Sequence, residues 1–318
     1  MSITAAGPEP RPIRAARGTY SYLKEPCTVR YLALVCLALL APRASAAELE
    51  RRITPLVKEH KGKVAIAVKH LKTGEELYLN ADEPMPSASL IKLPIMVEAY
   101  WQAKEDKIKF DKQVTLAKGD KVPGSGILTP HFSEGAAFPL KDAIRLMIVY
   151  SDNTATNMVI DQIGLPATGE RMAQLGLKNT KVNAKVFKPE TRLSQEFGKK
   201  YGLGSTTAKE AVRLLELIDA GKVVSPEACK EMLGHLKACD DKEKLVRYLP
   251  AGTVVAHKSG SVDATKTDAG IIYTKSGPVA VCVLTDANED KRWTADNAGQ
   301  VLIGKIAKEV FDHFAEKN

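Results

Sequence analysis

The stretch KVAIAVKHLKTGEELYLN, residues 63–80, decides the fold class because apolar and polar residues alternate on both sides of a short polar segment. Alternation with a period of two predicts β-strands, and Lys72 and Thr73 followed by Gly74 predict a tight turn between them. Just before this stretch, the pattern from Leu49 to Glu59 predicts a helix. The chain after residue 46 therefore opens with a helix and a β-hairpin.

Helical patterns fill the middle of the chain, and strand patterns return towards its end. Helices are predicted in LIKLPIMVEAYWQAK (residues 90–104), PLKDAIRLMIVY (139–150), NTATNMVIDQI (153–163) and TTAKEAVRLLELIDAG (206–221), the last of which stops at Gly221. Strands are predicted in TVVAHKSG (253–260), DAGIIYT (268–274) and PVAVCVLTDA (278–287), before a final helix from about Ala295 to Phe314. This order predicts an α/β (α+β) protein. Residues 47–84 and 243–318 would form one domain from both termini, and residues 85–242 an inserted all-helical domain.

The amino terminus has the layout of a secretory signal peptide. Five basic residues, Arg11, Arg14, Arg17, Lys24 and Arg30, precede an apolar run at residues 31–41 and the small residues of 44–46. The run is too short to span a bilayer, so we expect cleavage after Ala46 rather than an anchor. We therefore expect an exported protein, periplasmic or extracellular, with no stable membrane association after cleavage.

Composition and charge exclude several function classes. The 318 residues are 44% hydrophobic and 26% charged, which is typical of a globular protein. Residues 1–46 carry much of the net charge of +8, and the remainder carries +4 with no run of Lys and Arg, so nucleic-acid binding is not expected. The six histidines lack metal-ligand spacing, and we expect neither a metal nor a cofactor.

Three cysteines follow the leader. Cys282 lies in a strand pattern and is most simply a small core residue. Cys229 and Cys239 could form a disulfide if the helix between them breaks near Gly234, and the sequence leaves this open.

The first candidate site is Ser89 with Lys92, three residues later. On a helix these side chains lie one turn apart on the same face, so the amine can meet the hydroxyl. The following helix is apolar nearly all round, which predicts burial and a lowered pKa for Lys92. A neutral lysine can take the proton of a serine nucleophile. The alternative is that Ser89 is an N-cap and Lys92 extends to water.

Two further candidate sites lie later in the chain. One lies between two helical patterns, at Ser151, Asp152 and Asn153, which would simply cap the second helix. Alternatively, Ser151 would relay a proton and the Asn153 amide would hold a substrate carbonyl. Lys258 and Gly260 point to one side of a predicted strand, and the small Gly260 would let a substrate backbone approach. An edge-strand lysine can instead protect against aggregation. The second KSG, residues 275–277, is interpreted as a hairpin turn.

These three motifs in order, SLIK, SDN and KSG, are the serine-lysine signature of class A β-lactamases and penicillin-binding proteins. Over residues 47–318 the chain resembles a class A β-lactamase, including the SDNTATN continuation and LPAGTVVAHKSG. The resemblance implies an antiparallel five-stranded sheet flanked by helices. It also implies a small-molecule β-lactam substrate and a monomer.

The resemblance implies a role for each matching position. Ser89 would be the acylated nucleophile, Lys92 its proton partner, and Ser151 the proton donor to the lactam nitrogen. Asn153 would bind the substrate side-chain amide, Lys258 and Ser259 the substrate carboxylate, and the N–H groups of Ser89 and Ser261 the oxyanion, beside Gly260. Glu190 would activate the deacylating water.

Two positions depart from the family pattern. Ser194 replaces the asparagine that helps to hold the hydrolytic water, which weakens the case for fast deacylation. Lys266 lies near the position where family members often carry an arginine that supports carboxylate binding.

Two alternatives remain beside β-lactam hydrolysis. One is a D,D-peptidase like the penicillin-binding proteins, acting on peptidoglycan peptides, and the other is a non-catalytic homologue that binds β-lactams or peptides. Glu190 favours the hydrolase, because such peptidases generally lack an equivalent loop glutamate.

Overall fold

The computed structural model describes Gly7, Pro12 and residues 46–315. The signal peptide predicted for residues 1–46 lies outside these described residues except at positions 7, 12 and 46. The helices and strands reported below belong to one compact unit, Pro42–Asn318. The finer division at residues 84 and 242 stays a prediction.

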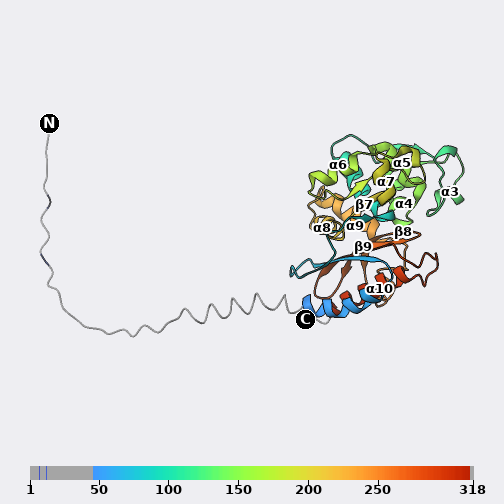
Figure 1. Cartoon of the computed structure of the whole chain (residues 1–318). Coiled ribbons are helices and arrows are strands. Elements are labelled where there is room, and N and C mark those ends of the chain that lie inside the picture. The colour runs from blue at the N-terminus through green and yellow to red at the C-terminus, as the bar shows by residue number, and fades with distance from the viewer. Residues whose placement is uncertain (1–6, 8–11, 13–45, 316–318) are drawn as a thin grey trace. The chain divides into compact units, whose positions relative to one another are not determined.

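A five-stranded antiparallel sheet forms the centre of this unit (Figure 1). Its strands are β1 (Lys63–His70), β2 (Glu76–Leu79), β8 (Val255–Val262), β9 (Thr265–Tyr273) and β10 (Pro278–Asp286), in the order β2-β1-β10-β9-β8. Pairing of β1 with β10 joins the first hairpin to the last strands of the chain. The expected sheet, built from both termini, is confirmed.

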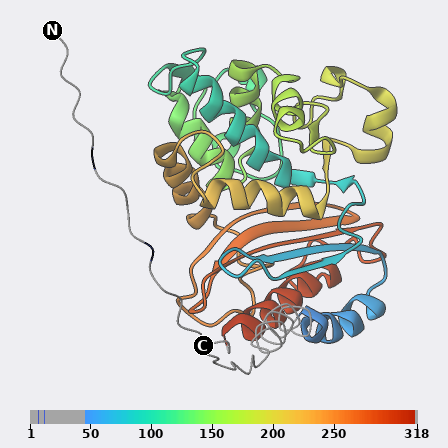
Figure 2. The ribbon, with the colours of Figure 1, turned by 90° about the vertical axis from the view of Figure 1, so that its left-hand side faces the viewer.

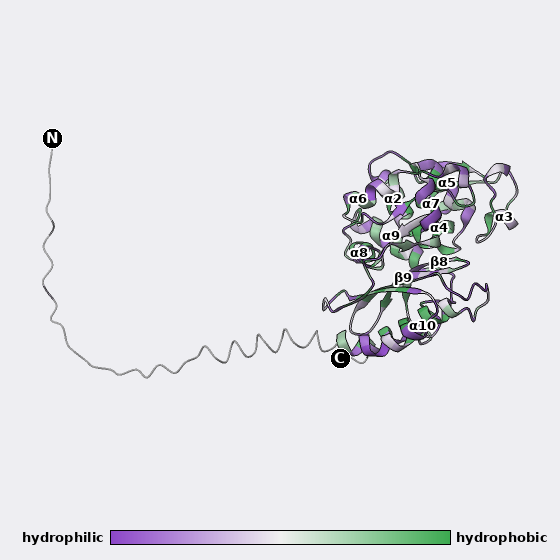
Figure 3. Cartoon of the chain, viewed as in Figure 1, coloured by the Kyte–Doolittle hydropathy of each residue, from purple (hydrophilic) through white to green (hydrophobic). Residues whose placement is uncertain are grey.

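Both faces of the sheet are buried, which explains the nearly continuous apolar runs of β1 and β10. On β10, Val281 and Val283 belong to the cluster that contains α10 (Ala298–Ala315), whereas Ala280 and Cys282 belong to the cluster of the other helices. Figure 2 shows the helix of residues 46–59 and α10 on one side of the sheet and the remaining helices on the other. The strands between these layers are largely hydrophobic (Figure 3).

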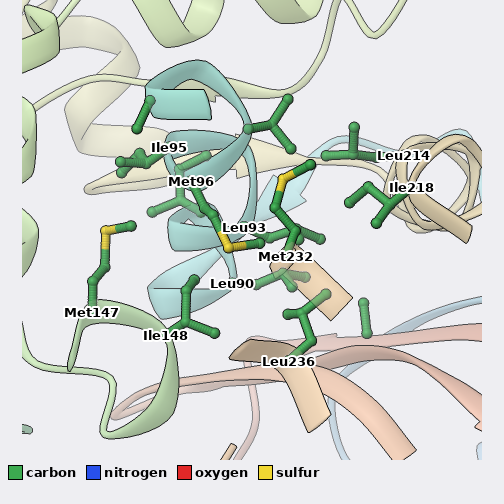
Figure 4. Packing of buried hydrophobic residues seen from close by; sticks show 14 of the residues in the cluster. Leu90, Leu93, Ile95, Met96, Met147, Ile148, Leu214, Ile218, Met232 and Leu236 are labelled. Atoms are coloured by element: carbon green, nitrogen blue, oxygen red, sulfur yellow. The ribbon is translucent and has the colours of Figure 1, made fainter. Parts of the chain in front are cut away.

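The second helical layer is built around α2 (Lys92–Lys104), which is buried nearly all round as its sequence predicted. Around it lie α4 (Leu140–Val149), α5 (Asn153–Ile163), α6 (Ala167–Gln174), α8 (Ala208–Asp219) and α9 (Pro226–Lys237). Leu93 and Met96 of α2 pack among Met147, Leu214 and Met232 from three of these helices (Figure 4).

Shorter elements connect these helices. They are β3 (Met85–Pro86), η1 (Ala88–Ile91), β4 (Gln113–Thr115), η2 (Lys118–Asp120), α3 (Leu128–His131), β5 (Ala137–Pro139), β6 (Lys181–Val182), η3 (Pro189–Thr191), α7 (Gln195–Tyr201) and β7 (Gly204–Thr206). Within residues 46–315, no helix is both long enough and apolar enough to cross a membrane.

The structure answers two questions from the sequence: whether Cys229 and Cys239 pair, and what the second KSG motif does. Helix α9 runs unbroken through Gly234 to Lys237, and Cys229 and Cys239 are both free buried thiols, so they form no disulfide. The second KSG motif lies between β9 and β10, where Gly277 has a φ of 142° and bonds back to Thr274. The interpretation of this motif as a hairpin turn is confirmed.

Strand β8 lies directly against η1, and Gly260 makes this contact possible. A Cβ at residue 260 would lie 2.7 Å from the backbone nitrogen of Ser89 and 2.8 Å from that of Leu90. Real side chains do not approach backbone atoms so closely. The space we expected a substrate backbone to use at Gly260 is therefore filled by the chain's own backbone.

We expect Gly260→Ala to lower the free energy of unfolding by about 1–3 kcal/mol, because the new methyl would overpack backbone that cannot turn aside. Urea unfolding measures the change. Gly234→Ala is the matched control, since a Cβ there meets nothing within 4 Å inside α9 and should stabilise the helix by up to about 1 kcal/mol. Equal stabilities of the two variants would contradict the packing described.

Candidate active site

Ser89 lies in η1, at the edge of a cleft of about 990 Å³ that it helps to line. The preceding residues are firmly held. Ser87 is fully buried, donates its N–H to the carbonyl of Gly204, and accepts a bond of 3.0 Å from the Thr267 hydroxyl. Ala88 has a φ of 46°, which is strained for a residue with a Cβ. The turn carrying Ser89 is thus fixed from both the sheet and β7.

Lys92 is 0% exposed, which overturns the alternative that its amine extends to water. Its Nζ donates to the Ser151 carbonyl at 2.6 Å, to the Ser151 Oγ at 3.1 Å and to the Asn153 Oδ1 at 2.8 Å. Burial, and then the nearby charge of Lys258, hold the pKa of Lys92 well below its ordinary value, against the opposing effect of Asp152. Among the hydrogen bonds of the described residues, none joins Lys92 to the Ser89 hydroxyl. The amine can act as a base, with Ser151 as its immediate partner.

Two lysines converge on the Ser151 hydroxyl. The Nζ of Lys258, like that of Lys92, lies 3.1 Å from the Ser151 Oγ. Lys258 also donates to the Ser259 carbonyl at 2.7 Å, and burial lowers its pKa. Although β8 is an edge strand, Lys258 is 0% exposed, so it does not serve as a solvated edge charge. Ser151 itself has a φ of 51°, a conformation that costs energy and points this hydroxyl between the two amines.

Asp152 holds the loop of residues 121–127, which leads into α3 and borders the cleft. Its side chain caps α5 by accepting from the Ala155 N–H at 2.8 Å, as one interpretation of the sequence predicted. It also accepts from the N–H groups of Ile127 and Leu128, at 2.7 and 2.8 Å. Gly126 has a φ of 122° and leaves no space for a Cβ against Asp152. One buried carboxylate therefore ties the loop to α5.

Asn153 has both ends of its amide engaged. The oxygen accepts from Lys92, and the Nδ2 donates to the Pro123 carbonyl at 2.9 Å. The residue is buried but still borders the cleft. The amide is thus held in one orientation.

Ser259 belongs to a charged network that the sequence did not reveal. Its hydroxyl donates to Asp241 at 2.6 Å, and the buried Lys244 amine bonds the same carboxylate oxygen at 2.6 Å. Burial alone would raise the pKa of Asp241, but Lys244 and the bond from Ser259 hold it well below its usual range. A run of charges such as DDKEK, residues 240–244, is usually solvated, so nothing in it indicated that Lys244 would be buried against Asp241.

Lys266 is not placed as a carboxylate ligand in this structure. Its Nζ donates to the carbonyls of Val262 and Asp263, at 2.8 and 3.3 Å, and lies 4.5 Å from the ring centroid of Trp293. Burial, and then the charge of Lys244, lower its pKa. Lys266 is outside the set of residues that line the cleft, whereas Ser261 is within it.

The loop that carries Glu190 borders the cleft, but Glu190 itself is exposed and is not one of the lining residues. Ser194 is also exposed, and its hydroxyl caps α7 by accepting from the Phe197 N–H at 3.2 Å. Asn183 fixes the loop by accepting from the Ser194 N–H and donating to its carbonyl. The structure brings Ser89, Lys92, Ser151, Asn153 and Lys258 together, and it leaves Glu190 and Ser194 at the surface.

We expect Asp152→Ala to lower the free energy of unfolding by about 3 kcal/mol or more, because the N–H groups of Ile127, Leu128 and Ala155 all lose the carboxylate that joins the start of α3 to α5. Chemical denaturation measures this. Ser225→Ala, which removes the single capping bond of α9, is the control and should cost about 1 kcal/mol. A loss no larger at Asp152 than at Ser225 would refute the tie between loop and helix.

Comparison with known proteins matches most of this chain to one protein family. The model of the Beta-lactamase enzyme family matches residues 48–314. The extended-spectrum beta-lactamase PER-1 of Pseudomonas aeruginosa is 25% identical over 308 residues, covering 93% of this chain and 96% of the relative.

Solved structures with a similar fold include a beta-lactamase and PBP-A. A beta-lactamase from Sphaerobacter thermophilus is 27% identical with a TM-score of 0.74, covering 83% of this chain and 97% of that one. PBP-A is 25% identical with a TM-score of 0.73, covering 84% and 96%.

Proposed function

Because the chain belongs to the beta-lactamase enzyme family, we propose that it hydrolyses β-lactams through an acyl-enzyme formed on Ser89. The observation that carries this proposal is the convergence of the buried Lys92 and Lys258 amines on the Ser151 hydroxyl, beside a cleft lined by Ser89. Two amines whose pKa values are lowered by burial, next to a serine at a cleft, are what general-base activation requires.

In the proposed acylation, the Ser89 oxygen bonds to the lactam carbonyl carbon and its proton passes to the Lys92 amine. The carbon–nitrogen bond of the ring then breaks, and the Ser151 hydroxyl delivers a proton to the nitrogen while it is resupplied by Lys92. The bonds from Lys92 to Ser151 support this route. The N–H groups of Ser89 and Ser261 would stabilise the oxyanion, and the packing of β8 on η1 at Gly260 supports their proximity.

Substrate binding is proposed at Asn153 for the side-chain amide and at Lys258 and Ser259 for the carboxylate. Behind this position the Asp241 carboxylate accepts the Ser259 hydroxyl and pairs with the Lys244 ammonium, so the pair orients Ser259 and adds little net charge. Lys266 would contribute only if its amine left the two loop carbonyls that it now binds. The substrate is thus held by buried groups that already have fixed partners.

Deacylation is proposed to use water activated by Glu190, with Ser194 nearby. The exposed position of Glu190 also favours a second candidate, a D,D-peptidase-like enzyme that acylates with β-lactams and releases them slowly. The likeness to PBP-A is compatible with that candidate. We further propose that the protein is exported and acts as a monomer.

We expect a rapid burst of one chromogenic cephalosporin per protein, followed by slower turnover, because the acylating groups are assembled and Glu190 is not in the cleft. Intact-protein mass at each time point should show an adduct on Ser89. Ser89→Ala should show neither burst nor adduct, and Glu190→Gln should keep the burst and prolong the adduct. A linear time course that Ser89→Ala leaves unchanged would refute the acyl-enzyme. An adduct lifetime unaffected by Glu190→Gln would favour the peptidase-like candidate.

We expect the acylation rate to rise with pH as Lys92 loses its proton, since only the neutral amine accepts the proton of Ser89. Burial lowers the pKa of Lys92, so the rise should be complete below the ordinary lysine value of 10.5. Quenched-flow mass spectrometry of the adduct gives the profile. Lys92→Arg keeps the positive charge but cannot lose it, so it should acylate slowly at every pH without this rise. The same rising limb in Lys92→Arg would assign it to another group.

A further inference from the structure

One wall of the cleft carries an excess of positive charge. Lys185, Lys188, Arg192 and Lys200 all line it, whereas Asp263 is the one acidic residue among the lining residues of the described chain. The four basic residues come from the segment that runs from before η3 to the end of α7, and Asp263 follows β8 on the sheet side.

Two of these five charges already have partners. Lys185 forms an ion pair with Asp161, so it adds little net charge. Asp263 accepts a bond of 2.8 Å from the Trp293 indole, on the side of the cleft formed by the sheet. The indole is neutral, so the lining keeps the one negative charge of Asp263 against the three positive charges of Lys188, Arg192 and Lys200.

Lys188 and Arg192 have only uncharged partners among the contacts of residues 46–315. The Lys188 amine donates to the Gly119 carbonyl at 3.0 Å. The Arg192 guanidinium makes one long bond of 3.4 Å to the Gln195 amide oxygen, and its Nε and Cδ lie against Gly198 of α7. Most of the donors of this guanidinium remain available to a ligand.

Lys200 has its amine 5.0 Å from the ring centroid of Tyr201, which also lines the cleft. The nearby acids, Glu190 and Glu196, are exposed and do not line the cleft. Five basic residues in the segment 185–203, set against these two acids and the Asp161 partner of Lys185, leave a net charge of +2. Fixed charges of one sign along the wall of a cleft concentrate the field there.

This wall begins beside the residue at which the substrate amide is proposed to bind. A Cβ at Gly124 would lie 2.8 Å from the Asn153 Nδ2 and 3.2 Å from the Phe187 ring, so the loop carrying Phe187 borders Asn153. A substrate held by its amide at Asn153 and by its carboxylate at Lys258 would direct its acyl side chain towards this loop.

We propose that Lys188, Arg192 and Lys200 form a subsite for a second anionic group, so that the cleft favours β-lactams whose acyl side chain carries its own carboxylate. The inference rests on the proposed function and adds the substrate class. Arg192 is the main ligand, because its planar guanidinium can bind a carboxylate through two parallel bonds. Lys188 and Lys200 contribute as point charges.

The test compares benzylpenicillin with α-carboxybenzylpenicillin, which differ by one carboxylate. The measured quantity is the ratio of their second-order rate constants for acylating Ser89. In Arg192→Gln/Lys200→Gln we expect the ratio of the dicarboxylate to the monocarboxylate to fall about threefold or more, as for two exposed ion pairs. In the unaltered protein the ratio should fall as salt is raised.

Lys181→Gln/Lys199→Gln is the matched control, because both lysines are exposed and lie outside the cleft while the change in net charge is the same. The ratio should not change in this variant. An unchanged ratio in Arg192→Gln/Lys200→Gln, or an equal fall in the control, would overturn the subsite.

Failure of the proposed function would look different, since neither penicillin would leave an adduct on the unaltered protein. In that case calorimetry on Ser89→Ala still decides the subsite. The dicarboxylate should bind Ser89→Ala more tightly than it binds the variant that also lacks the Arg192 and Lys200 charges. Equal affinities would overturn the subsite independently of catalysis.

Discussion

The Lys92 amine is completely buried, and the acceptors that compensate for its removal from water come from one short segment, residues 151–153. A buried amine without acceptors would be strongly destabilising. This requirement is consistent with the strained backbone of Ser151, since the turn places both its carbonyl and its hydroxyl on the amine. Asp152 secures the same turn through three N–H groups. The burial of one lysine thus fixes α2, α5 and the loop before α3 together.

The sheet contributes Lys258, the second lysine that reaches the Ser151 hydroxyl. Strand β8 is the edge of the sheet, yet its Lys258 lies inside, because η1 and the helical layer cover that edge. Gly260 allows the strand to approach the backbone of Ser89 closely enough for this cover to form. The two lysines reach the Ser151 hydroxyl from opposite layers, so the geometry of the candidate site depends on how the layers pack.

The loop from Lys185 to Ser194 follows different constraints. Asn183 and Thr191 hold its backbone through hydrogen bonds, while several of its charged side chains remain exposed. Such a loop can vary in its side chains without disturbing the buried network of Lys92. The acylating groups are therefore the fixed part of the site, and the loop that carries Glu190 and Arg192 is the part in which rate and substrate preference can change.

The sequence by itself determined the elements and the candidate nucleophile of this protein. The alternation in residues 63–80, the helical patterns between and the last three strands are local signals, and the structure has elements at each of these places. The order of SLIK, SDN and KSG likewise singled out Ser89, Lys92, Ser151 and Lys258, which the structure brings to one site.

Only the tertiary structure decided the partners of these side chains. Lys92 bonds to Ser151 and Asn153, some 60 positions away in the chain, rather than to the neighbouring Ser89 hydroxyl. Asp241 and Lys244 belong to a run of charges that is typical of a solvated segment, yet they form an ion pair behind Ser259 in which Lys244 is buried and Asp241 is partly exposed. Spacing along a helix shows which side chains share a face, whereas burial and pairing depend on what packs against that face. For the same physical reason, the sequence could not predict that the Glu190 side chain is exposed.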